Sequence, residues 1–459
     1  MRKTRQIMSE IHDTAIIGAG ASATLLAWNL RHRHDRNCVV IDPTQQPALG
    51  LAYRTRSIDN LLNVPASGMS ALADDCRHFT EWLQKKIDPA IDRDAFIPRA
   101  IYGLYLQDLF RQAAPLHART RVMSCMPDND IITLRLEGGR CLSARQIVLA
   151  LGHFSPPLLP GLSTELIHNR HYHHQVWDSH VPDAIASTDP VLLIGSGLTA
   201  IDQIMQLRAA GHTGRIMIVS RHARLPQRHD ATPKLDTPVI TPGSCVPRCT
   251  AYLHQFNAMM KRGIPWRACI DSLRPVTNQL WTDLPQEEKA RFRRHLQRRW
   301  DVVRHRMAPR IAEALDAGLA NGSLSLHAGH LQEIEAMTDG LRVMVRHGDR
   351  IDRFEVAHVL NCTGPNLHYD RVDSPLLHDL FARGLARPGQ GGAGLDTTDD
   401  GQLLGEDNKA RLPLYTLGPA RQGTLFESIA IPEIRSQAYD LARLLNGRLA
   451  RIQLQDLCA

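Results

Sequence analysis

The stretch from Asp13 to Asp42 constrains the fold more than any other part of the sequence. It consists of an apolar run, a Gly-x-Gly-x-x-Ala turn that begins at Gly18, an amphipathic segment, and a second apolar run closed by an acid. This order predicts a strand, a tight turn, a helix and a second strand. In such a unit the first glycine permits the turn, and the second lets a pyrophosphate approach the backbone. The helix N-terminus supplies N–H donors to the anion.

Five residues of this stretch are candidate ligands of a dinucleotide cofactor. Asp42 lies 24 positions after Gly18, where a carboxylate accepts hydrogen bonds from the ribose of an adenosine. A glycine turn alone also fits an incidental turn in another α/β domain, but here both strands, the helix and the acid follow in register. The candidate ligands are Gly18, Gly20, Ala21, Ser22 and Asp42.

The same pattern occurs a second time, between Val191 and Arg224. An apolar run precedes a second glycine turn, and a helix and the apolar run Ile216–Val219 follow it. Two complete units in one chain imply two dinucleotides, or one dinucleotide and one flavin. The candidate cofactor ligands of this unit are Gly195, Ser196, Gly197, Leu198, Thr199, Ser220 and Arg221.

The two units differ at the end of their second strand. The first ends in Asp42, whereas the second ends in Ser-Arg-His-Ala-Arg from Ser220 to Arg224, without an acid. A carboxylate there would repel a 2′-phosphate, while a hydroxyl and two guanidinium groups would bind it. We therefore expect FAD in the first unit and NADPH in the second. The alternative for Arg221 and Arg224 is ordinary solvated surface charge.

The expected fold class is α/β, with two Rossmann-type dinucleotide-binding domains and a helical insertion. A chain of 459 residues is too long for one compact core, and four segments after the second unit have helical patterns that this unit does not require. The expected parts are the first part of the FAD-binding domain at 1–160, the first part of the NADPH-binding domain at 161–235, the helical insertion at 236–322, the return strands of the NADPH-binding domain at 323–352, and the C-terminal part of the FAD-binding domain at 353–459.

Further candidates for contact with the flavin lie outside the glycine turns. A long loop after Asp42 is interrupted by proline and glycine yet carries apolar residues, and loops of this length are usually functional. Asn63 has the alternative of capping a turn, and Glu427 that of a structural ion pair. A helix is expected to begin near Pro432, and if its N-terminus points at the flavin, as such folds often arrange, its dipole would stabilise the anionic reduced ring. The candidates are Asn63, Met69 and Ser70 from the loop, Gly152 after a strand, and Gly418 and Glu427 near the C-terminus.

Composition argues against several other functional classes. The 54 basic and 47 acidic residues give a net charge of +7, and many basic residues lie between Arg291 and Arg310 in a helical pattern. A known nucleic-acid-binding module is missing there, so we expect no nucleic-acid partner. No long apolar run occurs near the start, so we expect neither a signal peptide nor a membrane anchor.

The cysteine and histidine patterns favour no metal. The nine cysteines include no Cys-x-x-Cys, so we expect reduced thiols and a cytoplasmic protein. The segment from His168 to Trp177 carries four histidines, but no cluster of carboxylates or cysteines supports a metal site. A surface or interdomain loop is the expected alternative.

Several segments, in order, carry a resemblance over nearly the whole chain. The sequence resembles the FAD/NAD(P)-binding protein family whose characterised members include flavin-dependent aspartate N-monooxygenases. His173 and Trp177 have the His-x-x-x-Trp spacing of Baeyer–Villiger monooxygenases, but the preceding Phe-x-Gly is missing, so that activity is not expected. The segments that carry the resemblance are Gly18–Ser22, Gly50–Tyr53, Leu61–Ala66, Met69–Ser70, Trp300–Arg306, Gly418–Pro419, Glu427 and Pro432–Arg435.

The resemblance implies an FAD-dependent, NADPH-consuming monooxygenase. Its substrates would be O2 and a small amine or amino acid such as aspartate, which would be N-hydroxylated through a C4a-hydroperoxyflavin. Asn63 is a candidate for the catalytic site, and Arg304 and Arg306 could pair with substrate carboxylates, although a solvated helix face explains them equally well. The alternatives are a flavoprotein reductase or dehydrogenase without oxygen insertion, and a non-catalytic flavin-binding sensor. The sequence leaves the oligomeric state open.

Overall fold

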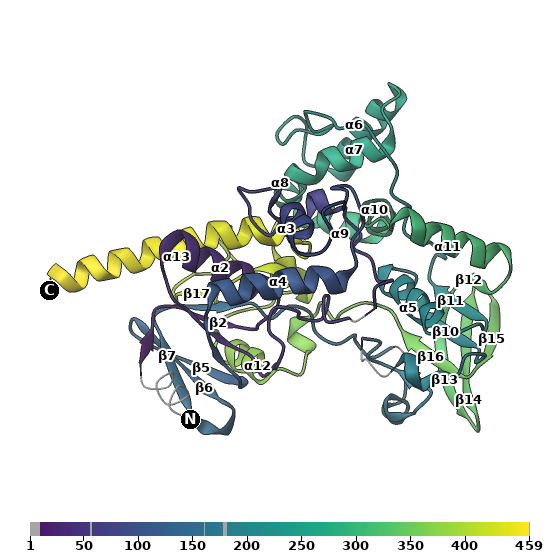
Figure 1. Ribbon diagram of the computed structural model, residues 1–459, viewed down its shortest axis with the longest axis horizontal. Coiled ribbons are helices and arrows are strands. Elements are labelled where there is room, and N and C mark those ends of the chain that lie inside the picture. Colours follow the sequence, from purple (N-terminus) through teal and green to yellow (C-terminus); the bar gives the residue numbers. More distant parts are fainter. Residues whose placement is uncertain (1–9, 56, 160, 178–180, 459) are drawn as a thin grey trace. The chain divides into compact units, whose positions relative to one another are not determined.

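A computed structural model describes residues 10–55, 57–159, 161–177 and 181–458 (Figure 1). The chain forms two compact units, each built from segments that are distant in the sequence. Unit 1 comprises the residues up to 54, residues 65–154 and the residues from 366 onward. Unit 2 comprises residues 55–64 and 155–365.

Unit 1 contains a five-stranded parallel sheet of order β17-β8-β2-β3-β4. All its strand residues except Leu116 and His117 are buried, as expected for a parallel sheet covered on both faces. Helix α2 (Ala21–His34) packs against α4 (Arg99–Ala113) and α13 (Ile431–Cys458) (Figure 1). The strands are β2 (Ala15–Ile17), β3 (Val39–Ile41), β4 (Leu116–Ala118), β8 (Ile147–Leu149) and β17 (Leu414–Thr416).

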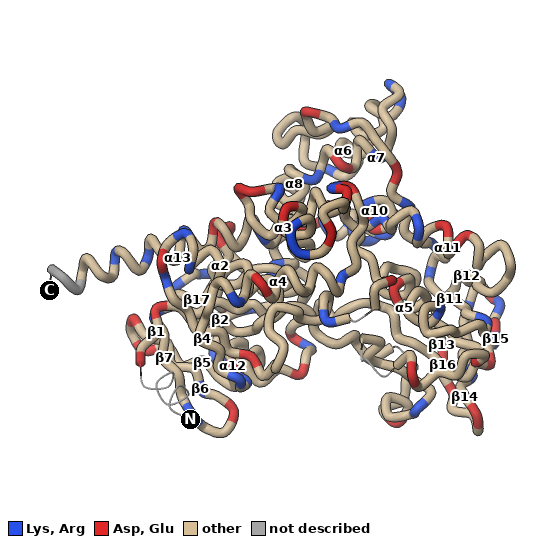
Figure 2. Tube along the Cα trace, viewed as in Figure 1, with Lys and Arg blue, Asp and Glu red and all other residues tan. Residues whose placement is uncertain are grey.

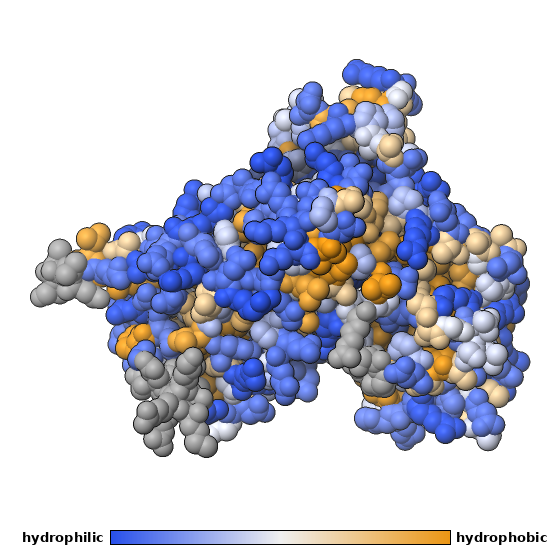
Figure 3. Space-filling model, viewed as in Figure 1, coloured by the Kyte–Doolittle hydropathy of each residue, from blue (hydrophilic) through white to orange (hydrophobic). Residues whose placement is uncertain are grey.

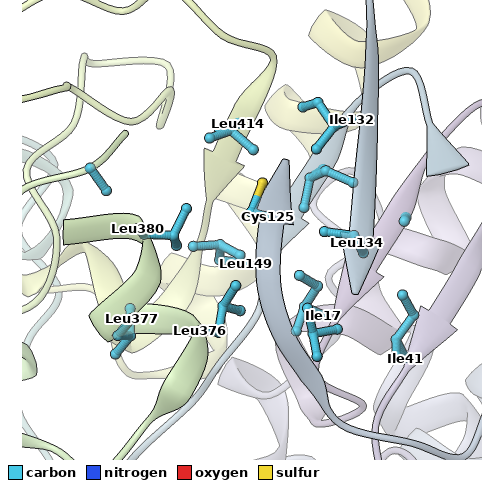
Figure 4. Packing of buried hydrophobic residues seen from close by; sticks show 14 of the residues in the cluster. Ile17, Ile41, Cys125, Ile132, Leu134, Leu149, Leu376, Leu377, Leu380 and Leu414 are labelled. Carbon is cyan, nitrogen blue, oxygen red and sulfur yellow. The ribbon is translucent and has the colours of Figure 1, made fainter. Parts of the chain in front are cut away.

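A second sheet of unit 1 has the order β1-β7-β6-β5. Strands β5, β6 and β7 pair in antiparallel order, and β1 adds a parallel edge. Helix α12 (Pro375–Ala382) packs on β5, and leucines of α12 meet Cys125, Ile132 and side chains of the parallel sheet in one apolar core (Figure 4). The remaining elements are β1 (Ile11–His12), β5 (Val122–Asp128), β6 (Ile131–Leu136), β7 (Cys141–Ala144) and α3 (His78–Lys86).

Unit 2 repeats the parallel arrangement in a sheet of order β12-β11-β10-β16-β9. Helix α5 (Leu198–Ala209) connects β10 to β11, and an antiparallel sheet of β13, β14 and β15 follows β12. The strands are β9 (Tyr172–His173), β10 (Val191–Ile194), β11 (Ile216–Ser220), β12 (Leu324–Ala328), β13 (His330–Met337), β14 (Gly340–His347), β15 (Arg350–Val356) and β16 (His358–Asn361).

The boundary between the units lies later than the sequence predicted. The expected return to the first domain at residue 353 would divide β15, but β16 pairs with β10 and β9 in the sheet of unit 2. Unit 1 therefore resumes at residue 366. Residues 55–64 also belong to unit 2, although they lie within the segment expected to form the first domain.

Six helices lie between β11 and β12, inside the expected insertion at 236–322. They enclose a small apolar cluster of their own that includes Leu273 and Leu280. None of the helices among the described residues combines the length and apolarity that crossing a membrane requires. The helices are α6 (Cys249–Lys261), α7 (Trp266–Leu273), α8 (Thr277–Asp283), α9 (Gln286–His295), α10 (Gln297–Arg304) and α11 (Pro309–Ala320).

Charged residues of both signs are interspersed along the chain in both units (Figure 2). The surface over α2 and α13 is mostly hydrophilic in the view of Figure 3, while the opposite sides of these helices pack together. Helix α13 begins at Ile431, close to Pro432 as the sequence predicted, and continues to Cys458.

Candidate functional site

The glycine turn of unit 1 requires glycine at its first position. Gly18 has a φ of +106°, and a Cβ built there would lie 2.3 Å from the carbonyl oxygen of Ala150. Its amide donates to Ile41 O at 2.9 Å, which fixes the turn at the carboxyl end of the sheet. At Gly20 a Cβ would meet only the Cα of Gly50, at 3.6 Å. Side chains are thus absent where a ligand would approach the turn.

The N-terminus of α2 presents backbone N–H groups that no side chain caps. Gly20 is its N-cap, no side chain caps the helix, and its first turn contains no acid. The first N–H groups of a helix have no intrahelical partner, so this end favours a phosphate. Ser22 is buried beneath Gly418, where a Cβ would lie 2.4 Å from Ser22 Oγ. The turn after β2 and the segment after β17 therefore meet at this helix end.

Asp42 lies beside the same turn. Its Oδ2 accepts a hydrogen bond from Ala19 N at 3.1 Å and its Oδ1 accepts one from Thr44 N at 2.8 Å. These bonds hold the carboxylate at the edge of the glycine turn, and each oxygen retains acceptor capacity for a ribose hydroxyl.

The loop residues Met69 and Ser70 are buried and held by two helices. Tyr102 of α4 donates its hydroxyl to Met69 O at 3.0 Å, and Arg435 of α13 donates to Ser70 O at 3.0 Å. Tyr105 Oη accepts a hydrogen bond from Ala71 N at 3.3 Å. Hydrogen bonds from α4 and α13 therefore fix this part of the loop within unit 1.

The remaining unit 1 candidates occupy different environments. Gly152 has a φ of +69° with open space at its missing Cβ, and its carbonyl accepts a hydrogen bond from Tyr369 at 2.8 Å. Glu427 is 4% exposed, so it is not an ordinary surface acid. The adjacent His153 was not singled out from the sequence; burial lowers the pKa of its imidazole to about 4.

Unit 2 has the same turn geometry. Gly195 has a φ of +111°, a Cβ there would lie 2.4 Å from Cys362 O, and its amide donates to Val219 O at 2.8 Å. Gly197 caps α5 without any side-chain cap or acid in the first turn, and no atom lies within 4 Å of its missing Cβ. Leu198 and Thr199 form the first turn of this helix.

The end of β11 carries the basic residues that the sequence singled out. Arg221 and Arg224 are exposed, and Ser220 Oγ lies 2.9 Å from Ser196 Oγ. Partial burial, followed by the positive charge of Arg298, lowers the pKa of Arg221. The serines thus tie the basic turn to the glycine turn.

The two arginines predicted to bind the substrate, Arg304 and Arg306, lie in unit 2 beside His229. Arg304 and Arg306 are buried, and Arg306 forms an ion pair with Asp271. Their charges, after burial, lower the pKa of His229 to about 4, so this imidazole is neutral near pH 7. A neutral His229 donates through Nε2 to the backbone oxygen of Asn63 at 2.8 Å.

His229 and Asp271 were not identified from the sequence. Both lie outside recognisable motifs, and only the folding of residues 55–64 onto unit 2 brings Asn63 to His229. The buried Nε of Arg306 has no hydrogen-bond partner among the residues that the structure describes. The Nε–H group of Arg306 can therefore donate a hydrogen bond to a ligand.

The sequence predicted a surface or interdomain loop for the histidine-rich segment, and two of its residues, Tyr172 and His173, form strand β9. His173 lies in β9, is buried, and its Nε2 is 3.1 Å from Nδ1 of His358, the first residue of β16. His358 also lies 3.4 Å from Asp189. These groups lie at the amino ends of parallel strands, the end opposite to the glycine turn. Within the described ranges, no three metal-binding side chains are grouped to hold an ion.

The first part of the chain is similar to a known family. Residues 15–154 match a protein-family model described as FAD-NAD(P)-binding. No curated protein matches the chain significantly.

Solved structures resemble the chain over nearly its whole length. The FAD-bound cadaverine monooxygenase of desferrioxamine biosynthesis from Erwinia amylovora has a TM-score of 0.68 at 15% identity, covering 96% of this chain and 95% of that chain. The ornithine N-hydroxylase from Kutzneria sp. 744 has a TM-score of 0.67 at 14% identity, covering 96% and 100%. The L-lysine 6-monooxygenase from Pseudomonas syringae has a TM-score of 0.65 at 16% identity, covering 95% and 99%. The predicted α/β fold is thereby confirmed.

Proposed function

We propose that this protein is an FAD-dependent, NADPH-consuming monooxygenase that N-hydroxylates a small amine or amino acid, with aspartate the first candidate. The observation that carries this proposal is the likeness in fold to N-hydroxylating monooxygenases over the full length of the chains compared. The resemblance to the family that includes aspartate N-monooxygenases supports the same activity.

Unit 1 fits FAD. The unfilled N-terminus of α2 binds the pyrophosphate, with Gly18, Gly20, Ala21 and Ser22 around it, and Asp42 accepts from the ribose. The buried wall at Met69 and Ser70, with Gly152, Gly418 and Glu427, lines the flavin ring. When bound there, FAD would supply the redox chemistry that couples NADPH and O2 to oxygenation of the amine. The protein binds and orients the reactants and excludes water from them.

Unit 2 fits NADPH. The open turn at Gly195, Ser196 and Gly197 and the N-terminus of α5, with Leu198 and Thr199, receive the pyrophosphate. Ser220 and Arg221 bind the 2′-phosphate at the end of β11.

The buried cluster around His229 favours a substrate that carries a carboxylate. Arg304 and Arg306 are both buried near His229, and the buried Nε of Arg306 has no hydrogen-bond partner among the described residues. A guanidinium group binds a carboxylate through paired hydrogen bonds, so Arg306 can donate to a substrate carboxylate. This favours an amino acid over a diamine such as cadaverine. Asn63 fixes the cluster through its carbonyl and presents a half-buried side chain.

A substrate panel tests this function. The FAD-loaded enzyme is mixed with NADPH, O2 and, in separate reactions, aspartate, ornithine, lysine or cadaverine. We expect amine-dependent NADPH consumption and a product one oxygen atom heavier, with aspartate giving the highest kcat/KM. NADPH consumption with all oxygen recovered as hydrogen peroxide would instead identify a reductase or oxidase. A flavin that NADPH leaves oxidised under anaerobic conditions would indicate a sensor.

We also place the enzyme in the cytoplasm. The support is chemical: eight cysteines among the described residues are free thiols, two of them exposed, as a reducing compartment allows. Non-reducing mass spectrometry of protein from cytoplasmic expression tests this, and the expected mass includes no disulfide.

A further inference from the structure

The basic turn after β11 has a fixed backbone. Ser220 Oγ accepts a hydrogen bond from Ala223 N at 3.1 Å, and Ala223 adopts a left-handed φ of +48°. Ser196 Oγ lies 2.7 Å from the carbonyl oxygen of Arg224. Because both ends of the turn are bonded, Arg221, His222 and Arg224 occupy defined positions at the carboxyl end of the sheet, with exposed side chains.

The helical insertion returns to this turn. Gln227, which follows it, donates its amide to Val302 O at 2.8 Å and accepts a hydrogen bond from Met307 N at 2.9 Å. Val302 lies in α10, and Arg298 lies four residues earlier, one turn away on the same face. The backbone bonds therefore bring Arg298 of the insertion to the turn of the nucleotide-binding unit.

The return strands bring a second basic group. Gly329 donates its amide to Ser220 O at 3.0 Å, and Ala328 pairs with Ser220 in the sheet. His330 directly follows. After partial burial, Arg221, Arg224, Arg298 and His330 all lower the pKa of His222, in this order. Three chain segments, the turn after β11, helix α10 and the start of β13, thus bring basic groups close to His222.

The charges of this cluster match a phosphate monoester. Arg221, Arg224 and Arg298 contribute three positive charges, and the carboxylate of Asp301, which pairs with Arg298 at 3.3 Å, contributes one negative charge. The remainder of +2 corresponds to the charge of about −1.5 to −2 on a phosphate monoester near neutral pH. Guanidinium groups bind such an oxyanion through paired hydrogen bonds.

We propose that Arg298, carried by the helical insertion, completes the site for the 2′-phosphate of NADPH and determines the preference for NADPH over NADH. This rests on the proposed use of NADPH by unit 2. The insertion then contributes directly to the dinucleotide site, and a cofactor that lacks the 2′-phosphate makes no contact with Arg298.

Binding of oxidised cofactors to the FAD-loaded protein tests this proposal without turnover. Isothermal titration measures Kd for NADP+ and for NAD+ with wild type, Arg298→Gln and Arg299→Gln. Arg299 is the matched control, because it is the next residue of α10, is equally exposed and carries the same charge. We expect Arg298→Gln to weaken NADP+ binding about tenfold or more, since it removes a charge-assisted contact, and to leave Kd for NAD+ unchanged. Arg299→Gln should change neither.

The outcomes separate this proposal from the function on which it rests. If wild type prefers NADP+ and Arg298→Gln keeps that preference, or weakens both cofactors equally, Arg298 is not a specificity residue although NADPH remains the cofactor. If Arg299→Gln has the same effect as Arg298→Gln, general surface charge explains both, and the proposal fails. If wild type binds NADP+ and NAD+ with equal affinity, the proposed preference for NADPH is wrong, and so is the proposed role of Arg298 in it. Retention of bound FAD by each variant confirms that it is folded.

Discussion

Gly18 and Gly20 lie two positions apart in one turn, yet an added methyl group meets different surroundings. At Gly18 it would overlap the Ala150 carbonyl, and the alanine would also have to adopt the positive φ of +106° that L side chains rarely adopt. At Gly20 the methyl group would make only an ordinary van der Waals contact. We expect Gly18→Ala to lower the free energy of unfolding by at least about 2 kcal/mol. Gly20→Ala should retain stability but weaken FAD binding, because its methyl group occupies the approach to the pyrophosphate.

Thermal unfolding of the apoprotein and FAD titration separate the two effects. Gly20→Ala is the control for the strain at Gly18, since both substitutions add the same atoms to the same turn. Equal melting temperatures for the two variants would contradict the strained turn, and unaltered FAD affinity in Gly20→Ala would contradict a pyrophosphate at this position.

His229 predicts a defined pH dependence of stability. Burial and the neighbouring arginines lower its pKa from 6.5 to about 4, so the unfolded chain takes up a proton at higher pH than the folded one does. The stability that neutral His229 contributes is therefore present above pH 6.5 and is lost as the pH falls toward 4. At 1.36 kcal/mol per pKa unit, the loss is at most about 3 kcal/mol.

Urea unfolding between pH 7 and 4 measures this slope in wild type and His229→Gln. Glutamine keeps an N–H donor for Asn63 O but does not titrate, so the variant should lose less stability over this range. His153, whose pKa is also lowered to about 4, remains in both proteins and cancels in the comparison. Parallel curves for the two proteins would show that His229 is not held neutral in the folded state.

At the scale of elements, α13 stabilises the loop of Met69 and Ser70. Arg435 donates a hydrogen bond to Ser70 O. It also lies near the buried tyrosines of α4: burial raises the pKa values of these tyrosines, and the positive charge of Arg435 partly offsets that rise. We expect Arg435→Gln to increase hydrogen exchange of the loop amides about tenfold, since a hydrogen bond from a charged donor contributes about 1.5–3 kcal/mol. Arg443→Gln is the matched control, because Arg443 is an exposed residue of the same helix and forms a surface ion pair with Asp440. Equal exchange in the two variants would contradict the role of Arg435.

The elements also show how much the sequence could predict. Both glycine units, most strands and the helical insertion followed from period, turn residues and the order of motifs. The placement of residues 55–64 in unit 2 and of β16 beside β10 did not, because chain crossing and strand order depend on contacts between distant segments. For the same reason Asn63, Arg304 and Arg306 could be named separately, while His229, which connects them, could not.

At the scale of the whole molecule, the two units have separate apolar cores. One core joins the two sheets of unit 1 with α12, and the other joins the two sheets of unit 2. Each unit has its own strained glycine, Gly18 in one and Gly195 in the other. A substitution in one glycine turn should therefore destabilise only the unit that contains that turn.

We expect Gly195→Ala to abolish NADP+ binding and to destabilise unit 2, because its Cβ would lie 2.4 Å from Cys362 O, while bound FAD is retained. Gly18→Ala is the reciprocal variant, and it should lose FAD while the helical insertion and sheet of unit 2 keep their hydrogen-exchange protection. Calorimetry with simultaneous flavin fluorescence measures both, since release of FAD reports on unit 1 alone. If Gly195→Ala released FAD at the same reduced temperature at which unit 2 unfolds, the two cores would unfold as one cooperative body, and the prediction that the damage stays in unit 2 would be wrong.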